Sequence, residues 1–233
     1  MSLEIKICGL STAETLEAAL GAGADMVGMV FFPASPRHVD LATARALAAQ
    51  VRGRARIVAL TVDADDALLA DIIAAIRPGL LQLHGHESPE RVAAIRARFG
   101  LPVMKAIGVA SRADLAALPA YAAVADTLLL DAKPPKGAVL PGGNGVAFDW
   151  DILAGLETTR PLILSGGLDP SNVGEAVRRI QPAGVDVSSG VESAPGIKDP
   201  ARIAAFVRAA READVPTARA VTQTSPARET SLS

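Results

Sequence analysis

The sequence predicts a single (β/α)8 barrel of the α/β class, and three observations support that prediction. Short apolar runs alternate eight times with longer segments rich in Ala, Leu, Arg and Glu, a pattern typical of parallel strands joined by crossover helices. The length of 233 residues suits one such barrel. Polar residues and glycines gather where the apolar runs end, which is where barrels of this class carry their sites.

Eight apolar runs are expected to form the strands. They are residues 3–8, 26–31, 56–62, 80–84, 103–107, 127–131, 162–165 and 185–188. Alternate side chains of a strand point to opposite faces, and the outward faces must be apolar to meet the helices. Ile5 and Ile7 are therefore predicted to face helices. The side chains predicted to point into the barrel are Glu4, Lys6 and Cys8, then Gln82 and His84, then Thr127, Leu129 and Asp131.

Helix starts are indicated by residues that cap unpaired first-turn amides. The expected starts are two capping boxes, Ser11 with Glu14 and Ser111 with Asp114, and three pairs that place proline in the first turn, Ser88-Pro89, Asp169-Pro170 and Asp199-Pro200. The helix after the sixth strand is predicted to be short and to begin near Asp149. It follows a Gly/Pro-rich loop, 133–147, that is a candidate lid. The barrel domain is expected to span 1–212, and the Thr/Ser-rich segment 213–233 to be a disordered tail.

Composition excludes several classes of function. A net charge of −2 with no basic cluster argues against a nucleic-acid partner, and no apolar run is long enough to cross a membrane. One cysteine and no signal-like start favour a reducing cytoplasm. The histidines lack metal-ligand spacing, so no metal is predicted. The sequence leaves open whether the protein is a monomer or a homodimer.

Polar residues end several of the predicted strands. Cys8 ends the first, His84 the fourth and Asp131 the sixth, and in a closed parallel barrel these ends meet at one pocket. Glycine-containing turns end the last two strands, where backbone amides could approach a phosphate, with the following helix N-termini adding a favourable dipole. The residues predicted to bind phosphate are Gly166, Gly167, Ser188, Ser189 and Gly190.

Taken together, the motifs resemble those of the phosphoribosylanthranilate isomerases of tryptophan biosynthesis. The resemblance extends from about residue 3 to residue 212. The segments that carry it are Lys6-Ile7-Cys8-Gly9, Phe31-Phe32-Pro33-Ala34-Ser35-Pro36-Arg37, Gln82-Leu83-His84-Gly85, Leu130-Asp131-Ala132-Lys133, Gly142-Gly143-Asn144-Gly145 with Phe148-Asp149-Trp150, Ser165-Gly166-Gly167-Leu168, and Asp186-Val187-Ser188-Ser189-Gly190-Val191-Glu192.

The resemblance implies an Amadori rearrangement that needs no cofactor. N-(5-phosphoribosyl)anthranilate would become 1-(2-carboxyphenylamino)-1-deoxyribulose 5-phosphate, with Asp131 as the general acid on the ring oxygen and Cys8 as the general base at C2. Arg37 resembles the arginine that binds the anthranilate carboxylate, and His84 and Asp186 are expected to contact the sugar. These roles require surroundings that favour the Cys8 thiolate and keep Asp131 protonated.

Other interpretations stay open at this point. Cys8 could be an inert buried thiol, and Asp131 could be a helix cap or an ion-pair partner of Lys133. Lys6 and Lys105 could form Schiff bases, although packing inside the barrel is the more common role of such residues. Competing enzymes are indoleglycerol-phosphate synthase, which would need lysine and glutamate at strand ends, and the dual-substrate isomerase, which has aspartate at the place of Cys8. A non-catalytic phosphate-binding barrel is a third hypothesis. The chain departs from the usual family pattern at residues 60–63, at Asn144 and in its tail.

Overall fold

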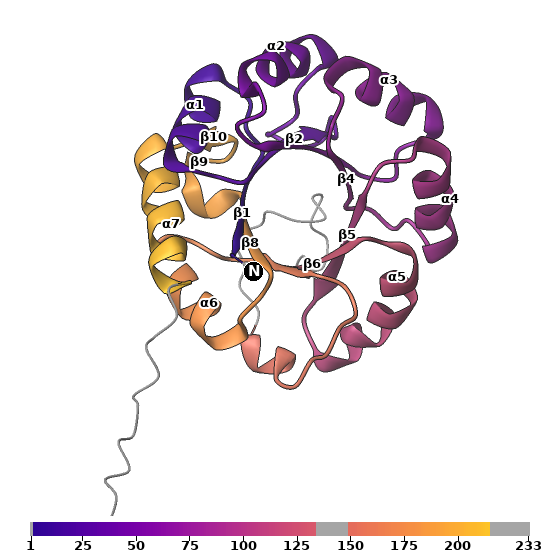
Figure 1. Cartoon of the computed structure of the whole chain (residues 1–233), viewed down its shortest axis with the longest axis vertical. Helices are drawn as coiled ribbons and strands as arrows, with labels where there is room; N and C mark the ends of the chain where they lie inside the picture. The colour runs from indigo at the N-terminus through magenta and orange to yellow at the C-terminus, as the bar shows by residue number, and fades with distance from the viewer. Residues whose placement is uncertain (1, 134–148, 215–233) are drawn as a thin grey trace, which may run out of the picture.

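A computed structural model describes residues 2–133 and 149–214 and closes eight parallel strands into one barrel, in the order β1 to β8 (Figure 1). The predicted fold class is therefore confirmed. The strands are β1 (Glu4–Cys8), β2 (Met26–Phe31), β3 (Arg56–Thr61), β4 (Leu80–Leu83), β5 (Val103–Val109), β6 (Thr127–Ala132), β7 (Leu162–Leu164) and β8 (Gly184–Val187). Strand β8 returns to pair with β1, which places Lys6 directly beside Asp186.

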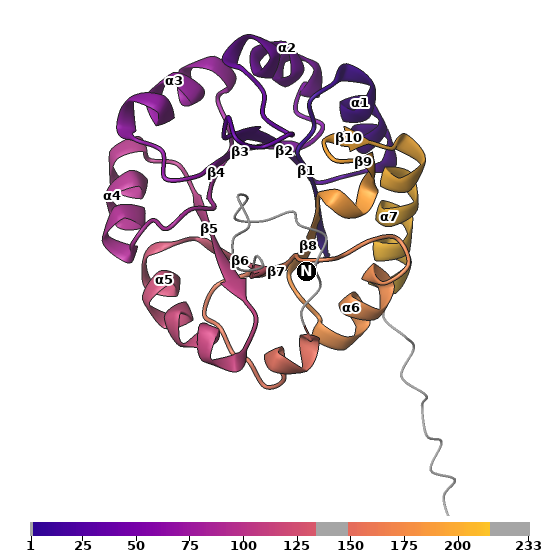
Figure 2. The same ribbon diagram turned by 180° about the vertical axis from the view of Figure 1, so that it is seen from behind.

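The helices form an outer ring around the strands, and the last helix lies beside the first (Figures 1 and 2). They are α1 (Ala13–Ala22), α2 (Leu41–Val51), α3 (Asp66–Ile76), α4 (Pro89–Phe99), α5 (Leu118–Val124), α6 (Val173–Ile180) and α7 (Pro200–Ala213). Three 3-10 helices are η1 (Arg112–Ala117), η2 (Trp150–Leu153) and η3 (Ser189–Val191). A hairpin of β9 (Glu192–Ala194) and β10 (Ile197–Lys198), which the sequence did not predict, follows η3.

Three of the predicted helix starts are confirmed. Ser88 caps α4 and Asp199 caps α7, each followed by proline in the first turn. Asp114 accepts a hydrogen bond from the backbone amide of Ser111 at 2.9 Å, although the helix that it starts is the 3-10 helix η1. The short helix η2 begins after Asp149, as predicted.

The other two predicted starts are wrong. Helix α1 is capped by Thr12, whose side chain accepts from the amide of Thr15, so the capping box with Ser11 does not form. Helix α6 begins only at Val173. Asp169 instead closes a turn before it, accepting from the amide and the hydroxyl of Ser171, both at 2.6 Å. The Asn172 side chain adds contacts with the Asp169 amide and the Gly167 carbonyl oxygen, both at 2.9 Å, so the residues before Val173 form a turn instead of the first turn of the helix.

Apolar side chains fill two separate layers. The larger layer lies between strands and helices and includes Ile5 and Ile7, which confirms their predicted outward direction. A smaller one plugs the barrel interior. Its residues are Met26, Val58, Leu80, Met104, Ala106, Leu129 and Ile163. Among the buried polar side chains that point into the barrel, those of Asp131 and Ser165 lie at the C-terminal ends of the strands.

Two predictions concern segments beyond the described residues. The candidate lid, apart from Lys133, and the tail from residue 215 onward lie outside them. Helix α7 runs to Ala213, and the Asp214 carboxylate accepts a hydrogen bond from the Leu3 amide at 3.0 Å. Among the helices of the described ranges, none is long and apolar enough to span a bilayer.

Candidate active site

Cys8 is the last residue of β1 and lies buried at the C-terminal rim of the barrel, next to Val30 and Leu60. Burial raises the pKa of its thiol, and the positive charges of Lys6 and Lys198 oppose that shift without reversing it. The expectation that the surroundings of Cys8 favour the thiolate outright is therefore wrong. The increase in the thiol pKa caused by burial is larger than the decrease caused by Lys6 and Lys198.

Asp131 lies at the same rim, near the end of β6, and is buried. One carboxylate oxygen accepts from the Ala132 amide at 2.9 Å, and the other lies 3.3 Å from Nε2 of His84. Nδ1 of His84 lies 3.1 Å from the side-chain nitrogen of Gln82. The two ring nitrogens of His84 therefore connect the Gln82 side chain on one side with the Asp131 carboxyl group on the other. Gln82 and His84 thus orient the Asp131 carboxyl group.

Arg37 is buried and already engaged by a carboxylate of the protein. Its Nε and Nη2 donate to the two oxygens of Glu192 at 2.7 and 2.9 Å. Glu192 also accepts from Nζ of Lys198 at 2.6 Å. Burial works against ionisation of Glu192, yet Arg37 and Lys198 together hold its pKa below the ordinary value. The guanidinium is therefore fixed in one orientation by this pair of contacts.

The two glycine turns predicted to bind phosphate lie against each other. A Cβ atom on Gly190 would sit 1.9 Å from the carbonyl oxygen of Leu168, so the turns after β7 and β8 touch backbone to backbone. Gly166 and Gly167 both have positive φ angles, and their amides donate to no group among residues 2–133 and 149–214. Lys198 donates to the carbonyl oxygen of Ser188 at 2.9 Å and so brings a positive charge to the second turn.

One part of the phosphate argument needs correction. The helices that follow these turns were expected to point their N-termini at the anion. The turn after β8 itself contains the three-residue 3-10 helix η3, which includes Ser189 and Gly190, and α6 begins six residues after Gly167. Support for an anion therefore comes from the turn amides and from Lys198 rather than from a helix dipole.

Asp186 lies deeper in the barrel than Cys8. Its carboxylate accepts from Nζ of Lys6 at 2.7 Å and from the hydroxyl of Ser165 at 3.1 Å. All three side chains are buried. Asp186 therefore belongs to an internal ion pair with Lys6, and its contact with the sugar stays a prediction.

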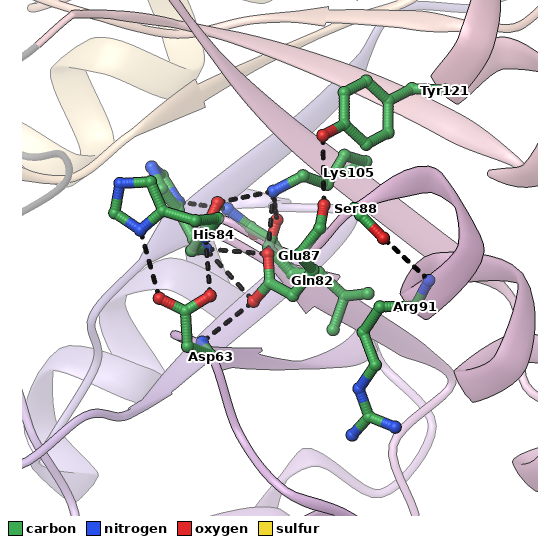
Figure 3. A network of polar contacts seen from close by, with 11 residues as sticks. Asp63, Gln82, His84, Glu87, Ser88, Arg91, Lys105 and Tyr121 are labelled. Carbon is green, nitrogen blue, oxygen red and sulfur yellow. Dashed lines mark hydrogen bonds and ion pairs between the residues drawn. The ribbon is translucent and has the colours of Figure 1, made fainter.

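Lys105 has a structural role inside the barrel, the more common of the two roles considered for it, and not that of a Schiff-base nucleophile. Its ammonium group donates to Glu87 at 2.8 Å and to the carbonyl oxygens of Leu83 and Gly85, so its donors are committed (Figure 3). Glu87 also accepts from the amides of Asp63 and Gly85. This buried pair fixes the chain on both sides of His84.

Sequence reasoning missed Glu192, Lys198, Glu87 and Gln82 as parts of the site. Glu192 ends the last motif of the resemblance, and Gln82 opens another, so both were visible but had no role assigned to them. Lys198 and Glu87 carried no signal, because each follows a strand end by several residues and reaches the site through a loop or hairpin.

Comparisons with known proteins agree with this geometry. The family model described as N-(5'phosphoribosyl)anthranilate (PRA) isomerase matches residues 5–209. A protein of Rhodopseudomonas palustris strain BisA53, named N-(5'-phosphoribosyl)anthranilate isomerase, is 66% identical over 211 residues, 91% of this chain and 97% of that protein.

Solved structures are similar over the whole barrel. The phosphoribosyl anthranilate isomerase of Thermotoga maritima has a TM-score of 0.82 and 34% identity, covering 90% of this chain and 99% of that one. A phosphoribosyl anthranilate isomerase in complex with reduced 1-(o-carboxyphenylamino)-1-deoxyribulose 5-phosphate has a TM-score of 0.79 and 32% identity, with the same coverage.

Proposed function

This chain belongs to the N-(5'-phosphoribosyl)anthranilate isomerase family, and from that premise we propose how its residues catalyse the Amadori rearrangement of N-(5'-phosphoribosyl)anthranilate. The product is 1-(2-carboxyphenylamino)-1-deoxyribulose 5-phosphate, an intermediate of tryptophan biosynthesis. The observation that supports the assignment is the placement of Cys8 and Asp131 on one rim of the barrel, beside two adjoining glycine turns.

Asp131 is the general acid. It protonates the ring oxygen of the ribose, so the bond between that oxygen and C1 breaks and the nitrogen lone pair forms a Schiff base at C1. His84 and Gln82 hold the carboxyl group in one orientation during this step. Such fixed geometry is what general acid catalysis requires.

Cys8 is the general base. As a thiolate it removes the proton from C2 of the Schiff base, and the electron pair of that bond moves to give an enolamine. The enolamine then tautomerises to the ketose product, taking up a proton at C1. No electrons leave the substrate, so the reaction needs no external oxidant or reductant.

The two ends of the substrate are bound by different elements. The turns after β7 and β8 bind the phosphate through their amides, helped by Lys198. Arg37 binds the anthranilate carboxylate, and Glu192 holds its guanidinium in one orientation through Nε and Nη2. In this proposal the Asp186 carboxylate accepts a hydrogen bond from Lys6 and fixes the position of that ammonium group.

The first prediction tests the acid and the base. With N-(5'-phosphoribosyl)anthranilate generated in situ and followed by its fluorescence decay, Cys8→Ser and Asp131→Asn should each lose at least about a hundredfold in kcat. Asp71→Asn, an exposed change on α3, is the control and should be as active as the wild type. A near-normal rate in either active-site variant would refute that residue's role.

The same assay separates the competing functions. A barrel that only binds phosphorylated ligands would show no decay with the wild-type protein. The dual-substrate isomerase would also turn over the corresponding histidine-pathway aminoaldose, and the synthase would act on the product instead of the substrate. Turnover of phosphoribosylanthranilate alone is the expected result.

A further inference from the structure

Three charged residues from three elements influence the ionisation of Cys8 in the described part of the chain. Lys6 comes from β1, Asp186 from β8 and Lys198 from β10. The mechanism uses Lys198 at the phosphate turn but leaves the Lys6–Asp186 pair without a chemical task. A buried ion pair is costly to form, so its presence beneath a reactive thiol calls for an explanation.

The side chains of Lys6 and Cys8 both lie next to Gly28, which has no side chain to occupy the space beside them. The two residues lie two positions apart on the inward face of β1, and Gly28 of β2 stands in register opposite Cys8. A Cβ atom on Gly28 would lie 3.1 Å from the Cys8 sulfur and 3.2 Å from Nζ of Lys6. Any larger residue there would press on both groups.

The Lys6 ammonium is held in place from its other side. Its side chain is fully buried, and Nζ lies 2.7 Å from one oxygen of Asp186, whose other oxygen accepts from Ser165. Burial disfavours the ammonium form, but the Asp186 carboxylate and Cys8 reverse that effect and raise the pKa of Lys6. Lys6 therefore stays protonated, which also rules against its acting as a Schiff-base nucleophile.

We propose that Lys6 is a positioning residue that supplies the counter-ion of the Cys8 thiolate, held in register by Asp186. This inference rests on the proposed function, because it concerns the base of that reaction. Its physical basis is that a fixed cation offsets part of the cost of creating an anion away from water. The charge of Lys198, on β10, also lowers the pKa of the Cys8 thiol.

The sign of the pH dependence follows from this arrangement. Cys8 must lose its proton to act, so kcat/KM rises with pH as the thiol ionises. Without the Lys6 ammonium the thiol is harder to ionise, and the rising limb moves to higher pH. The remaining Asp186 carboxylate pushes in the same direction.

The second prediction is measured on the free enzyme. Because Cys8 is the single cysteine and Tyr121 the single tyrosine of the chain, the ultraviolet absorbance of the thiolate reports Cys8 once the separately measured ionisation of Tyr121 is subtracted. Lys6→Met should raise the thiol pKa by at least about one unit, which is about tenfold less thiolate at neutral pH, and should move the kcat/KM limb equally. Lys6→Arg keeps the charge and should restore most of the thiolate.

Lys105→Met is the matched control, because it also removes a buried lysine from a carboxylate partner, but away from Cys8. It should leave the thiol pKa unchanged. If Lys6→Met proves unstable, the double variant Lys6→Met/Asp186→Asn removes both charges, and the thiol pKa should still exceed that of the wild type. Equal thiol pKa values in the Lys6 and Lys105 variants would overturn the proposal. Absence of isomerase activity in the wild type would refute only the proposed function, since the titration needs no substrate.

Discussion

Gly190 is a residue whose missing side chain decides how two loops meet. Its backbone lies so close to Leu168 that a methyl group would overlap the carbonyl oxygen. The neighbouring atoms belong to the backbone, so they cannot move aside as the end of a flexible side chain would. The close approach of the two phosphate turns therefore depends on this single glycine.

The third prediction follows from that contact. Gly190→Ala should separate the turns, lower kcat/KM at least tenfold, mainly through a higher KM, and destabilise the fold by about 1–3 kcal/mol, as overpacking does. Steady-state kinetics and urea denaturation measure the two effects. Gly21→Ala on α1, where a Cβ atom would meet nothing within 4 Å, is the control and should leave KM unchanged. Equal behaviour of the two variants would contradict the assigned contact.

Single residues also show where prediction from sequence succeeds. The inward direction of Lys6 and Cys8 followed from strand alternation, and the placement of Cys8 and Asp131 at one rim followed from the barrel itself. The pKa direction of Cys8 could not be predicted, because it depends on how completely the closed barrel excludes water from the sulfur. That balance is a property of three elements distant in sequence.

At the scale of elements, the β9–β10 hairpin links the two binding regions. Glu192 from β9 contacts Arg37, and Lys198 from β10 contacts both Glu192 and Ser188. The hairpin was not predicted, because its strands have three and two residues and lack an apolar run. Its importance comes from charge pairing rather than from hydrophobic burial.

The fourth prediction concerns this hairpin. Glu192→Gln should raise KM, because Arg37 loses its partner, and should destabilise the protein by about 3 kcal/mol at pH 7. The pKa of Glu192 is lowered in the folded state, so its carboxylate stabilises fully above the unfolded pKa of about 4.3, and the stabilisation is lost as pH falls further. The difference between wild type and variant should therefore shrink on acidification.

Urea denaturation across that pH range measures the effect. Glu17→Gln removes an exposed partner of Arg54 and is the control, with little change expected at any pH. A stability difference for Glu192→Gln that is the same at pH 7 and at about pH 3 would contradict the assigned role of its charge.

Helix starts show the limits of local signals. Ser88 and Asp199 each precede a proline and cap as predicted, whereas Asp169 precedes a proline and does not. The Asp199 and Asp169 carboxylates both accept from the amides two and three residues ahead. Around Asp169, however, the Ser171 hydroxyl also donates to the carboxylate and the Asn172 side chain accepts from the Asp169 amide, and the helix begins only at Val173. Local motifs predict that a helix follows, but competing hydrogen bonds decide its first residue.

At the scale of the whole molecule, the last helix, α7, stabilises the place where the barrel closes between β1 and β8, called here the seam. Arg211 of α7 donates to the carbonyl oxygens of Leu3 and Gly23 and pairs with Asp25, which in turn accepts from the Ile5 amide. The first strand is thus held by a side chain near the end of the described chain. The eightfold pattern predicted the barrel, but not this fastening.

The fifth prediction tests the seam. Arg211→Ala should lower the free energy of unfolding by about 1–3 kcal/mol, since it removes charge-assisted hydrogen bonds from three partners. Arg208→Ala, an exposed change on the same helix, should have little effect. Urea denaturation distinguishes the two, and equal stabilities would show that the seam does not depend on Arg211.

The register of β1 against β8 has a consequence for how the enzyme comes into being. Lys6 precedes Asp186, its neighbour across the closing strands, by 180 residues, so Asp186 is synthesised only after the first seven strands of the barrel. A growing or truncated chain that lacks the eighth strand therefore contains Cys8 and Lys6 but not Asp186, the carboxylate that holds the Lys6 ammonium in place. The arrangement proposed for the Cys8 thiolate is therefore complete only when β8 has paired with β1.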